Sequence, residues 1–176
     1  MQRKIIFVGG VHGVGKSTLC NSICTSMNAT HHSASELISR FGKVNHSTNK
    51  RVENIGKNQD VLITAINEYL ATGQSYLLDG HFCLLNRNGE VVEIPFSTFG
   101  ALSPVAIMVL FDDPIKIFTR LKERDKEKYD IDSLTSFQKK ELDYSESIAR
   151  KLDVPYMKAN SFVDGDKLTK FAERFL

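Results

Sequence analysis

The chain has 176 residues, of which 41% are hydrophobic and 25% are charged, and its formal net charge is +2. This length predicts one domain over residues 1–176 with a full hydrophobic core. The nearly balanced charge gives no overall field to concentrate a nucleic acid or an acidic membrane, although a local site for a polyanion stays open. Apolar runs such as 4–8 and 105–111 are far shorter than the roughly 18 residues of a membrane span, so we expect a cytoplasmic protein.

The first predicted elements are a strand, a glycine-rich loop and a helix. Residues 4–8 form a continuous β-rich run, as expected for a parallel strand that is covered on both faces. From Lys16 to about Met27, apolar residues recur four apart and place one apolar stripe on a helix, namely Leu19, Ile23 and Met27. The sequence therefore predicts strand, loop and helix in direct succession.

The three cysteines do not have the spacing of a metal site. Cys20 and Cys24 lie four apart on the first predicted helix, and Cys83 lies far along the chain. An odd number of cysteines without such a spacing is typical of buried thiols in a reducing compartment. We therefore predict that they are buried thiols in a reducing cytoplasm.

A strand, two helices and a second strand are predicted next. A short strand over 29–32 precedes the helix start Ser33-Ala34-Ser35-Glu36. A firmer helix runs from about 57 to 71 and stops at Gly73, because its apolar residues repeat at helical spacing: Val61, Leu62, Ala65, Ile66, Tyr69 and Leu70. Residues 75–80 are an apolar run that ends in an acid and a glycine, which indicates another core strand.

The next segment predicts a hairpin, a buried strand and a helix. Residues 83–95 alternate loosely around Asn88-Gly89, a dipeptide favoured in tight turns, so we expect a small projecting β-hairpin inserted outside the core. Residues 105–111 are a further buried strand, and Pro114 begins the following helix. The charged, glycine-free stretch 125–132 is a candidate mobile segment.

The remaining elements complete an alternation of strands and helices. A long helix carries apolar residues along one face: Leu134, Phe137, Tyr144, Ile148 and Leu152. A strand over 156–158 follows, and then a terminal helix with Leu168, Phe171 and Phe175. Such alternation predicts an α/β fold with three layers, α/β/α, around a mostly parallel sheet of five strands.

The loop after the first strand carries the strongest motif in the chain. Gly10, Gly15, Lys16 and Ser17 satisfy the pattern G-x-x-x-x-G-K-[ST] within Gly10-Val11-His12-Gly13-Val14-Gly15-Lys16-Ser17-Thr18, between a strand and a helix. Glycines let the backbone turn its N–H groups toward phosphates at a helix N-terminus. We expect Lys16 to reach the β- and γ-phosphates of ATP, Ser17 to hold Mg²⁺, and Thr18 to add a phosphate contact. The sequence thus predicts a P-loop.

Two side chains after the 75–80 strand are candidates for the same site. Asp79 would lie beside the P-loop, where its carboxylate orders Mg²⁺ through water or accepts a proton from the acceptor. A helix cap or a loop acid is the structural alternative. His81 contacts a substrate or serves as a structural hydrogen bonder, and the sequence leaves both readings open.

Basic residues repeat at spacing of four in the helix after Pro114. Lys116, Arg120, Arg124 and Lys128 would form one face that clamps the transferring phosphoryl group. A solvated face balanced by glutamates is the alternative, and we favour function for Arg120 and Arg124. The sequence has no Asn-Lys-x-Asp element, which would give a regulatory GTPase its base specificity, because Asn49-Lys50-Arg51 lacks the acid. This argues against a regulatory GTPase.

These motifs resemble the nucleoside monophosphate kinases, especially archaeal-type adenylate kinases and their bacterial nucleotide-kinase-like relatives. The likeness rests on residues 10–18, on Leu77-Leu78-Asp79-Gly80-His81, which is similar to the family's Asp-Thr-His, and on 120–125, which is similar to its arginine-rich lid. The helix over 138–149 also looks like the one after that lid. The resemblance implies a P-loop NTPase fold with a lid over about 123–132, and Arg51 and Gln59 as residues that bind the acceptor's phosphate and base.

The resemblance implies transfer of the ATP γ-phosphoryl group to a nucleoside monophosphate, with Mg²⁺, Lys16, Asp79, Arg120 and Arg124 at the reacting groups. Lysines and Tyr129 replace additional arginines of the archaeal lid, and Glu93-Ile94-Pro95-Phe96 replaces a Leu-Pro-Gly-like turn, so the acceptor is not fixed by the likeness. Two alternatives stay open. One is a kinase for another hydroxyl, on a nucleoside, a metabolite or a polynucleotide end. The other is a regulatory ATP-binding protein that acts on a protein partner.

Overall fold

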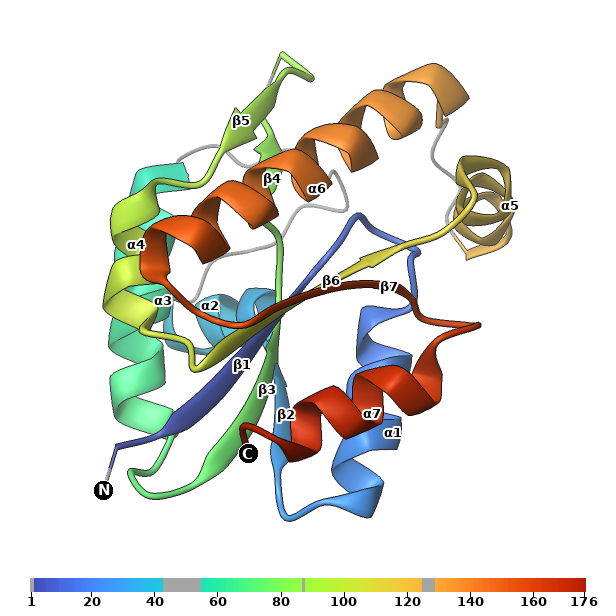
Figure 1. Cartoon of the computed structure of the whole chain (residues 1–176). Coiled ribbons are helices and arrows are strands. Elements are labelled where there is room, and N and C mark those ends of the chain that lie inside the picture. Colours follow the sequence, from blue (N-terminus) through green and yellow to red (C-terminus); the bar gives the residue numbers. More distant parts are fainter. Residues whose placement is uncertain (1, 43–54, 87, 125–128) are drawn as a thin grey trace.

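The structure is a computed structural model that describes residues 2–42, 55–86, 88–124 and 129–176. Strands and helices alternate along most of the chain (Figure 1). Their order is β1 (Lys4–Gly9), α1 (Lys16–Ser26), β2 (Thr30–Ser33), α2 (Ala34–Gly42), α3 (Ile55–Tyr69), β3 (Ser75–Asp79), β4 (Cys83–Leu85), β5 (Val91–Glu93), α4 (Phe96–Leu102), β6 (Ala106–Phe111), α5 (Pro114–Arg124), α6 (Ile131–Leu152), β7 (Tyr156–Asn160) and α7 (Gly165–Glu173).

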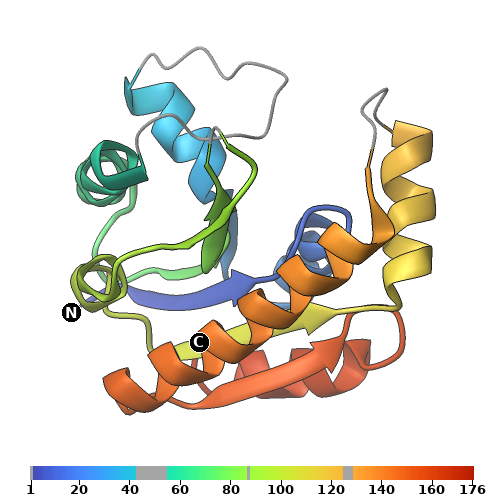
Figure 2. The ribbon, with the colours of Figure 1, turned by 90° about the horizontal axis from the view of Figure 1, so that it is seen from above.

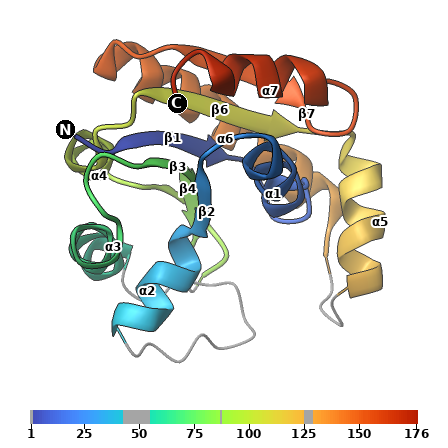
Figure 3. The same ribbon diagram turned by 90° about the horizontal axis from the view of Figure 1, so that it is seen from below.

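The main sheet has five parallel strands in the order β2-β3-β1-β6-β7. Figure 3 shows these strands side by side, with β1 at the centre. In the register of β1 with β3, Val8 pairs with Asp79, so both strands end at the same edge of the sheet. The predicted α/β fold with a five-stranded parallel sheet is confirmed.

Helices cover both faces of this sheet, so alternate residues of each strand are buried on opposite sides. Ile6 and Val8 pack in one hydrophobic cluster with α1 and α7. Ile5 and Phe7 pack in a second cluster with α2, α3 and α4. Figure 1 shows α1 and α7 on one side of the sheet and α3 and α4 on the other. In Figure 2, α6 runs across the sheet from the end near α5, and this long helix contributes to both clusters.

The predicted hairpin is present, but its base belongs to the core. β4 and β5 pair antiparallel, and Gly89 adopts φ 79° in the turn between them. The side-chain oxygen of Asn86 accepts hydrogen bonds from the backbone N–H groups of Asn88 and Glu90, which closes the turn. Cys83 at the start of β4 is fully buried, because the hairpin leaves the sheet beneath α6. The prediction that the hairpin lies wholly outside the core was therefore wrong for Cys83 and also for Ile94, which is buried at the other end of the predicted segment.

Several other boundaries differ from the sequence prediction. Helix α4 was not predicted, because it is short and gives little helical periodicity. Of its seven residues, the buried apolar ones are Phe99 and Leu102, which lie three apart. The terminal helix ends at Glu173, before Phe175. In the predicted lid, α5 ends at Arg124 and α6 begins after its N-cap Asp130, while residues 125–128 lie outside the described residues. No described helix is both long and apolar enough to cross a membrane.

Candidate active site

The glycine-rich loop lies between β1 and α1, at the carboxyl edge of the sheet. Gly10, Gly13 and Gly15 have φ values of 140°, 77° and 99°, which side chains rarely tolerate. A Cβ atom on Gly13 would also lie 2.8 Å from Cγ of Leu121 in α5. These constraints explain the glycines of the motif, and they bring α5 directly against the loop.

Lys16 lies across this loop, with its side chain buried. Its Nζ donates hydrogen bonds to the backbone carbonyls of Gly10 at 2.6 Å and Val11 at 3.1 Å. Burial lowers the pKa of Lys16, although the carboxylates of Asp79 and Glu141 act in the opposite direction. The chain thus holds a desolvated ammonium group over the loop, as a phosphate-binding lysine requires.

Asp79 ends β3 next to the first turn of α1. Its Oδ2 accepts hydrogen bonds from Ser17 Oγ at 2.9 Å and from His31 Nε2 at 2.7 Å. Burial by itself would raise the pKa of Asp79, but the bonds from His31 and Ser17 and the charge of Lys16 hold it below its usual value. The carboxylate is therefore ionised beside the hydroxyl that the motif assigns to Mg²⁺.

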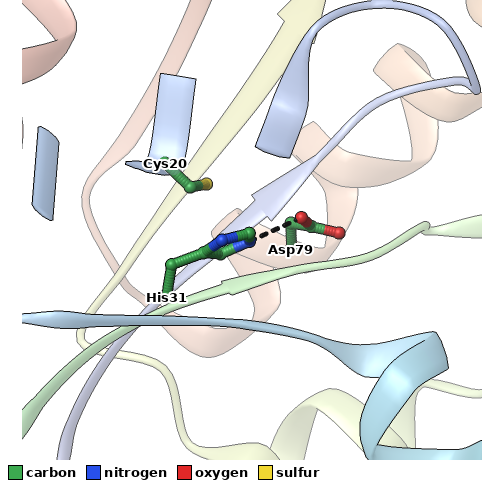
Figure 4. Close-up of side chains that lie close together, drawn as sticks. All are labelled: Cys20, His31 and Asp79. Atoms are coloured by element: carbon green, nitrogen blue, oxygen red, sulfur yellow. Dashed lines mark hydrogen bonds and ion pairs between the residues drawn. The ribbon is translucent and has the colours of Figure 1, made fainter. Parts of the chain in front are cut away.

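His31 is a site residue that the sequence did not reveal. It lies on β2, which pairs in parallel with β3, and in Figure 4 its imidazole meets the carboxylate of Asp79. Its other ring nitrogen lies 2.9 Å from the side-chain oxygen of Asn21 in α1. The register of β2 beside β3 brings the two side chains together, and this register is invisible before the strands are paired.

Glu141 is the second residue that sequence reasoning missed. This carboxylate of α6 is fully buried and accepts backbone hydrogen bonds from Gly10 at 3.0 Å, Phe82 at 2.9 Å and Cys83 at 2.7 Å. Burial raises the pKa of Glu141 to about 7, against the effect of these N–H groups and of Lys16. Glu141 therefore ties the start of the P-loop and the segment after β3 to the helix that follows the predicted lid.

His81 and His12 lie close to Glu141 and to each other. Nδ1 of His81 is 3.8 Å from Oε1 of Glu141, and the rings of His81 and His12 have centroids 4.3 Å apart. His12 belongs to the P-loop, so His81 stands at the loop as well. The predicted substrate contact of His81 and its structural alternative are both compatible with this position.

Arg120 connects α5 to the P-loop. Its Nε donates to the backbone carbonyl of Gly13 at 3.0 Å, and a terminal nitrogen donates to Oδ2 of Asp112 at 2.6 Å. Asn160 donates to the other oxygen of Asp112 at 2.9 Å. Burial alone would raise the pKa of Asp112, but the bonds from Arg120 and Asn160 lower it. The guanidinium also lies over the ring of Phe162, 4.5 Å from its centroid.

The other candidate residues are placed as follows. Val11 and Val14 are buried within the loop, whereas Thr18 is exposed at the first turn of α1. Arg124 is the exposed last residue of α5. Gln59 is buried in α3, and Arg51 lies outside the described residues. The structure thus gathers Lys16, Ser17 and Asp79 at one point.

The residues at this point fit a nucleotide phosphate and its magnesium ion. A Cβ atom at Gly10 would lie 2.8 Å from the backbone carbonyl oxygen of Leu110, so the loop can pass close to β6 at this position only with a glycine. The donor set joins a buried ammonium, a hydroxyl and an ionised carboxylate. A hydroxyl and a carboxylate are oxygen ligands of the kind that Mg²⁺ prefers, and an ammonium and backbone N–H groups suit phosphate oxygens.

Comparison with known families supports this interpretation of the loop. A family model described as an AAA domain matches residues 9–138, which is well over half of the chain. The matched range begins at the end of β1 and reaches into α6. A search of curated protein sequences found no match.

Solved structures of similar fold cover nearly the whole chain. A gluconokinase from Sinorhizobium meliloti 1021 has a TM-score of 0.55 and 15% identity, over 96% of this chain and 89% of that one. A shikimate kinase from Bacteroides thetaiotaomicron has a TM-score of 0.57 and 13% identity, over 97% and 98% of the two chains. A shikimate kinase from Acinetobacter baumannii in complex with shikimate has a TM-score of 0.57 and 9% identity, over 97% and 91%. Identities this low show a shared fold.

Proposed function

The chain belongs to the AAA domain family, and from that premise we propose that it transfers the γ-phosphoryl group of ATP to a small acceptor. The observation that carries this proposal is the meeting of Lys16, Ser17 and Asp79 at the carboxyl edge of β1 and β3. Ligands of open parallel sheets bind outside this edge. The similar folds of a gluconokinase and two shikimate kinases support a small-molecule kinase.

Each residue of the site has a role in this proposal. The N–H groups of residues 10–18 hold the phosphates, and Lys16 exchanges its carbonyl partners for phosphate oxygens. Ser17 and Asp79 hold Mg²⁺, which neutralises charge on the transferring group when bound. Arg120 fixes α5 against Gly13, and Arg120 and Arg124, both on α5, stabilise charge on the transferring group.

We propose a nucleoside monophosphate as the acceptor, with Arg51, Gln59 and His81 as the residues that bind it. Of these, His81 supports the proposal by its position beside the P-loop, because its ring lies 4.3 Å from that of the P-loop residue His12. A hydroxyl of a small metabolite is the second candidate. It is favoured by the shikimate kinases and the gluconokinase that share this fold.

The test is ADP release from Mg-ATP against a panel of acceptors. The panel contains AMP, CMP, UMP and GMP, their nucleosides, and hydroxyl-bearing sugar acids. We expect one acceptor to stimulate turnover, because a kinase needs its acceptor to complete the site and exclude water. Stimulation by a monophosphate would establish the nucleotide kinase, and stimulation by a hydroxy acid would establish the second candidate.

A regulatory ATP-binding protein would behave differently in this assay. It would bind ATP and hydrolyse it slowly, with no change in rate across the whole panel. That result would overturn the kinase proposal and direct the search to a protein partner. A polynucleotide acceptor would reveal itself by binding that weakens steeply with added salt.

A further inference from the structure

Three potential metal ligands converge beside the P-loop from three separate elements. Cys20 comes from α1, His31 from β2 and Asp79 from the end of β3 (Figure 4). The thiol sulfur, one imidazole nitrogen and one carboxylate oxygen all lie within 4.8 Å of one another. Cys20 and Asp79 are buried, and His31 is partly buried. The spacing of the cysteines in the sequence gave no indication of this group.

The group has the composition of a site for a thiophilic divalent ion. Thiolate, imidazole and carboxylate are together the ligands of zinc, and three protein ligands leave a fourth position for water or another donor. Thiolate is a soft ligand that suits zinc, whereas magnesium prefers oxygen ligands. Cys20 and His31 therefore add sulfur and nitrogen ligands, whereas Ser17 and Asp79 offer Mg²⁺ oxygen ligands alone.

The surroundings of the three side chains suit a preformed site. His31 contacts Asn21 through the ring nitrogen that faces away from Asp79, at 2.9 Å. A polar partner on the second nitrogen is what orients a metal-bound imidazole. Asp79 is likewise held by Ser17 through Oδ2. The hydrogen bond between His31 and Asp79, 2.7 Å long, would open to admit the ion.

We propose that Cys20, His31 and Asp79 bind Zn²⁺ or a similar thiophilic divalent ion. Binding forms a sulfur–metal bond, and the thiol proton leaves to solvent as the thiol becomes a thiolate. The site thereby couples occupancy to proton release.

A zinc ion bound at Cys20, His31 and Asp79 would interfere with the binding of Mg-ATP. Asp79 accepts a hydrogen bond from the Ser17 hydroxyl, and it is also one of the three proposed zinc ligands. A zinc ion and the magnesium of ATP would therefore compete for one carboxylate. This consequence rests on the proposed function. The metal site itself does not, because binding of an ion to the chain requires no ATP.

The test is titration of the full chain with Co²⁺ in the absence of ATP, followed by displacement with Zn²⁺. Cobalt bound to a thiolate gives a sulfur-to-metal absorption band, and we expect this band to appear and to vanish on addition of Zn²⁺. Cys20→Ser should abolish it, and His31→Ala should weaken Co²⁺ binding by more than the roughly 10–100-fold that loss of an outer-shell partner costs. Cys24→Ser is the matched control, because Cys24 lies one turn further along α1 and outside the group.

Three outcomes overturn the proposal. They are absence of the band in the unsubstituted chain, its persistence in Cys20→Ser, and its loss in Cys24→Ser. Thermal unfolding of each variant without metal shows that it is folded, and proton release on Zn²⁺ addition provides a second readout. Failure here leaves the acceptor assay untouched, and a chain without kinase activity would still show the band.

Discussion

Replacing Lys16 with alanine is expected to reduce acceptor-stimulated ADP release by about 10²–10³-fold, the effect of removing one positioned donor from a transferring group. Its ammonium is buried and already lies against the loop carbonyls of Gly10 and Val11. Once it has exchanged these carbonyls for phosphate oxygens, a desolvated ammonium stabilises developing charge without further reorganisation. Steady-state turnover with Mg-ATP and the stimulating acceptor measures the effect.

Lys122→Ala is the matched control for this substitution. Lys122 lies on α5 and is exposed, so the change removes the same charge without touching the loop. We expect its turnover to equal that of the unsubstituted chain. Thermal unfolding confirms that the Lys16 variant is folded. A Lys16→Ala protein with undiminished turnover would contradict the role assigned to the P-loop.

Replacing Glu141 with alanine is expected to destabilise the protein by about 3–9 kcal/mol, and to lower its Tm by at least about 6 °C. The carboxylate accepts the backbone N–H groups of Gly10, Phe82 and Cys83, and alanine leaves all three buried donors without this acceptor. Each buried donor that loses its acceptor costs about 1–3 kcal/mol. Denaturant and thermal unfolding measure the loss.

Glu146→Ala is the matched control on the same helix. Glu146 is exposed and pairs with Arg150 one turn away, so its removal should cost less than about 1 kcal/mol. If Glu141→Ala were as mild as this control, Glu141 would not anchor the loop. We expect Glu141→Gln to fall between the two, because glutamine keeps one of the two acceptor oxygens.

Glu141 should also leave a signature in the pH dependence of stability. Its pKa is raised from 4.5 to about 7 in the folded chain, so between these values the folded state holds a proton that the unfolded state has released. The contribution of this group to stability is therefore full below pH 4.5 and is lost as the pH rises to about 7. The free energy of unfolding should fall more steeply with pH in the unsubstituted chain than in Glu141→Gln. Parallel curves would contradict the shift.

The P-loop and the parallel sheet could be predicted because their signals are local. The spacing of Gly10, Gly15 and Lys16 forms a complete motif, and the apolar runs 4–8 and 105–111 read directly as buried strands. Helical periodicity likewise located α3 and α6. Helix α4 escaped notice because it is short and buries only a few side chains.

The residues that complete the site could not be predicted, because their partners are distant in the sequence. His31 meets Asp79 across 48 positions, and Glu141 meets Gly10 across 131. In the sequence, His31 is one of two adjacent histidines and Glu141 is one of several acids on a charged helix. Only the pairing of β2 with β3, and the course of α6 over the sheet, give these side chains a chemical setting.

The basic residues on the helix after Pro114 have different surroundings in the structure, although their spacing in the sequence is regular. Lys116 and Arg124 are exposed, whereas Arg120 is held by the carbonyl of Gly13 and the carboxylate of Asp112. The spacing placed these residues on one face, and the residue types favoured a function for Arg120 and Arg124. Burial of Asp112 at the end of β6 singles out Arg120 as the residue that positions α5 against the loop.

The most direct test of the account follows the labelled γ-phosphoryl group of ATP during turnover with the acceptor that stimulates ADP release. The account predicts that the label appears on the acceptor, in amounts equal to the ATP consumed, and that Lys16→Ala suppresses this transfer. Label that appears only as inorganic phosphate, at the same rate with and without acceptor, would contradict phosphoryl transfer and identify the protein as an ATPase.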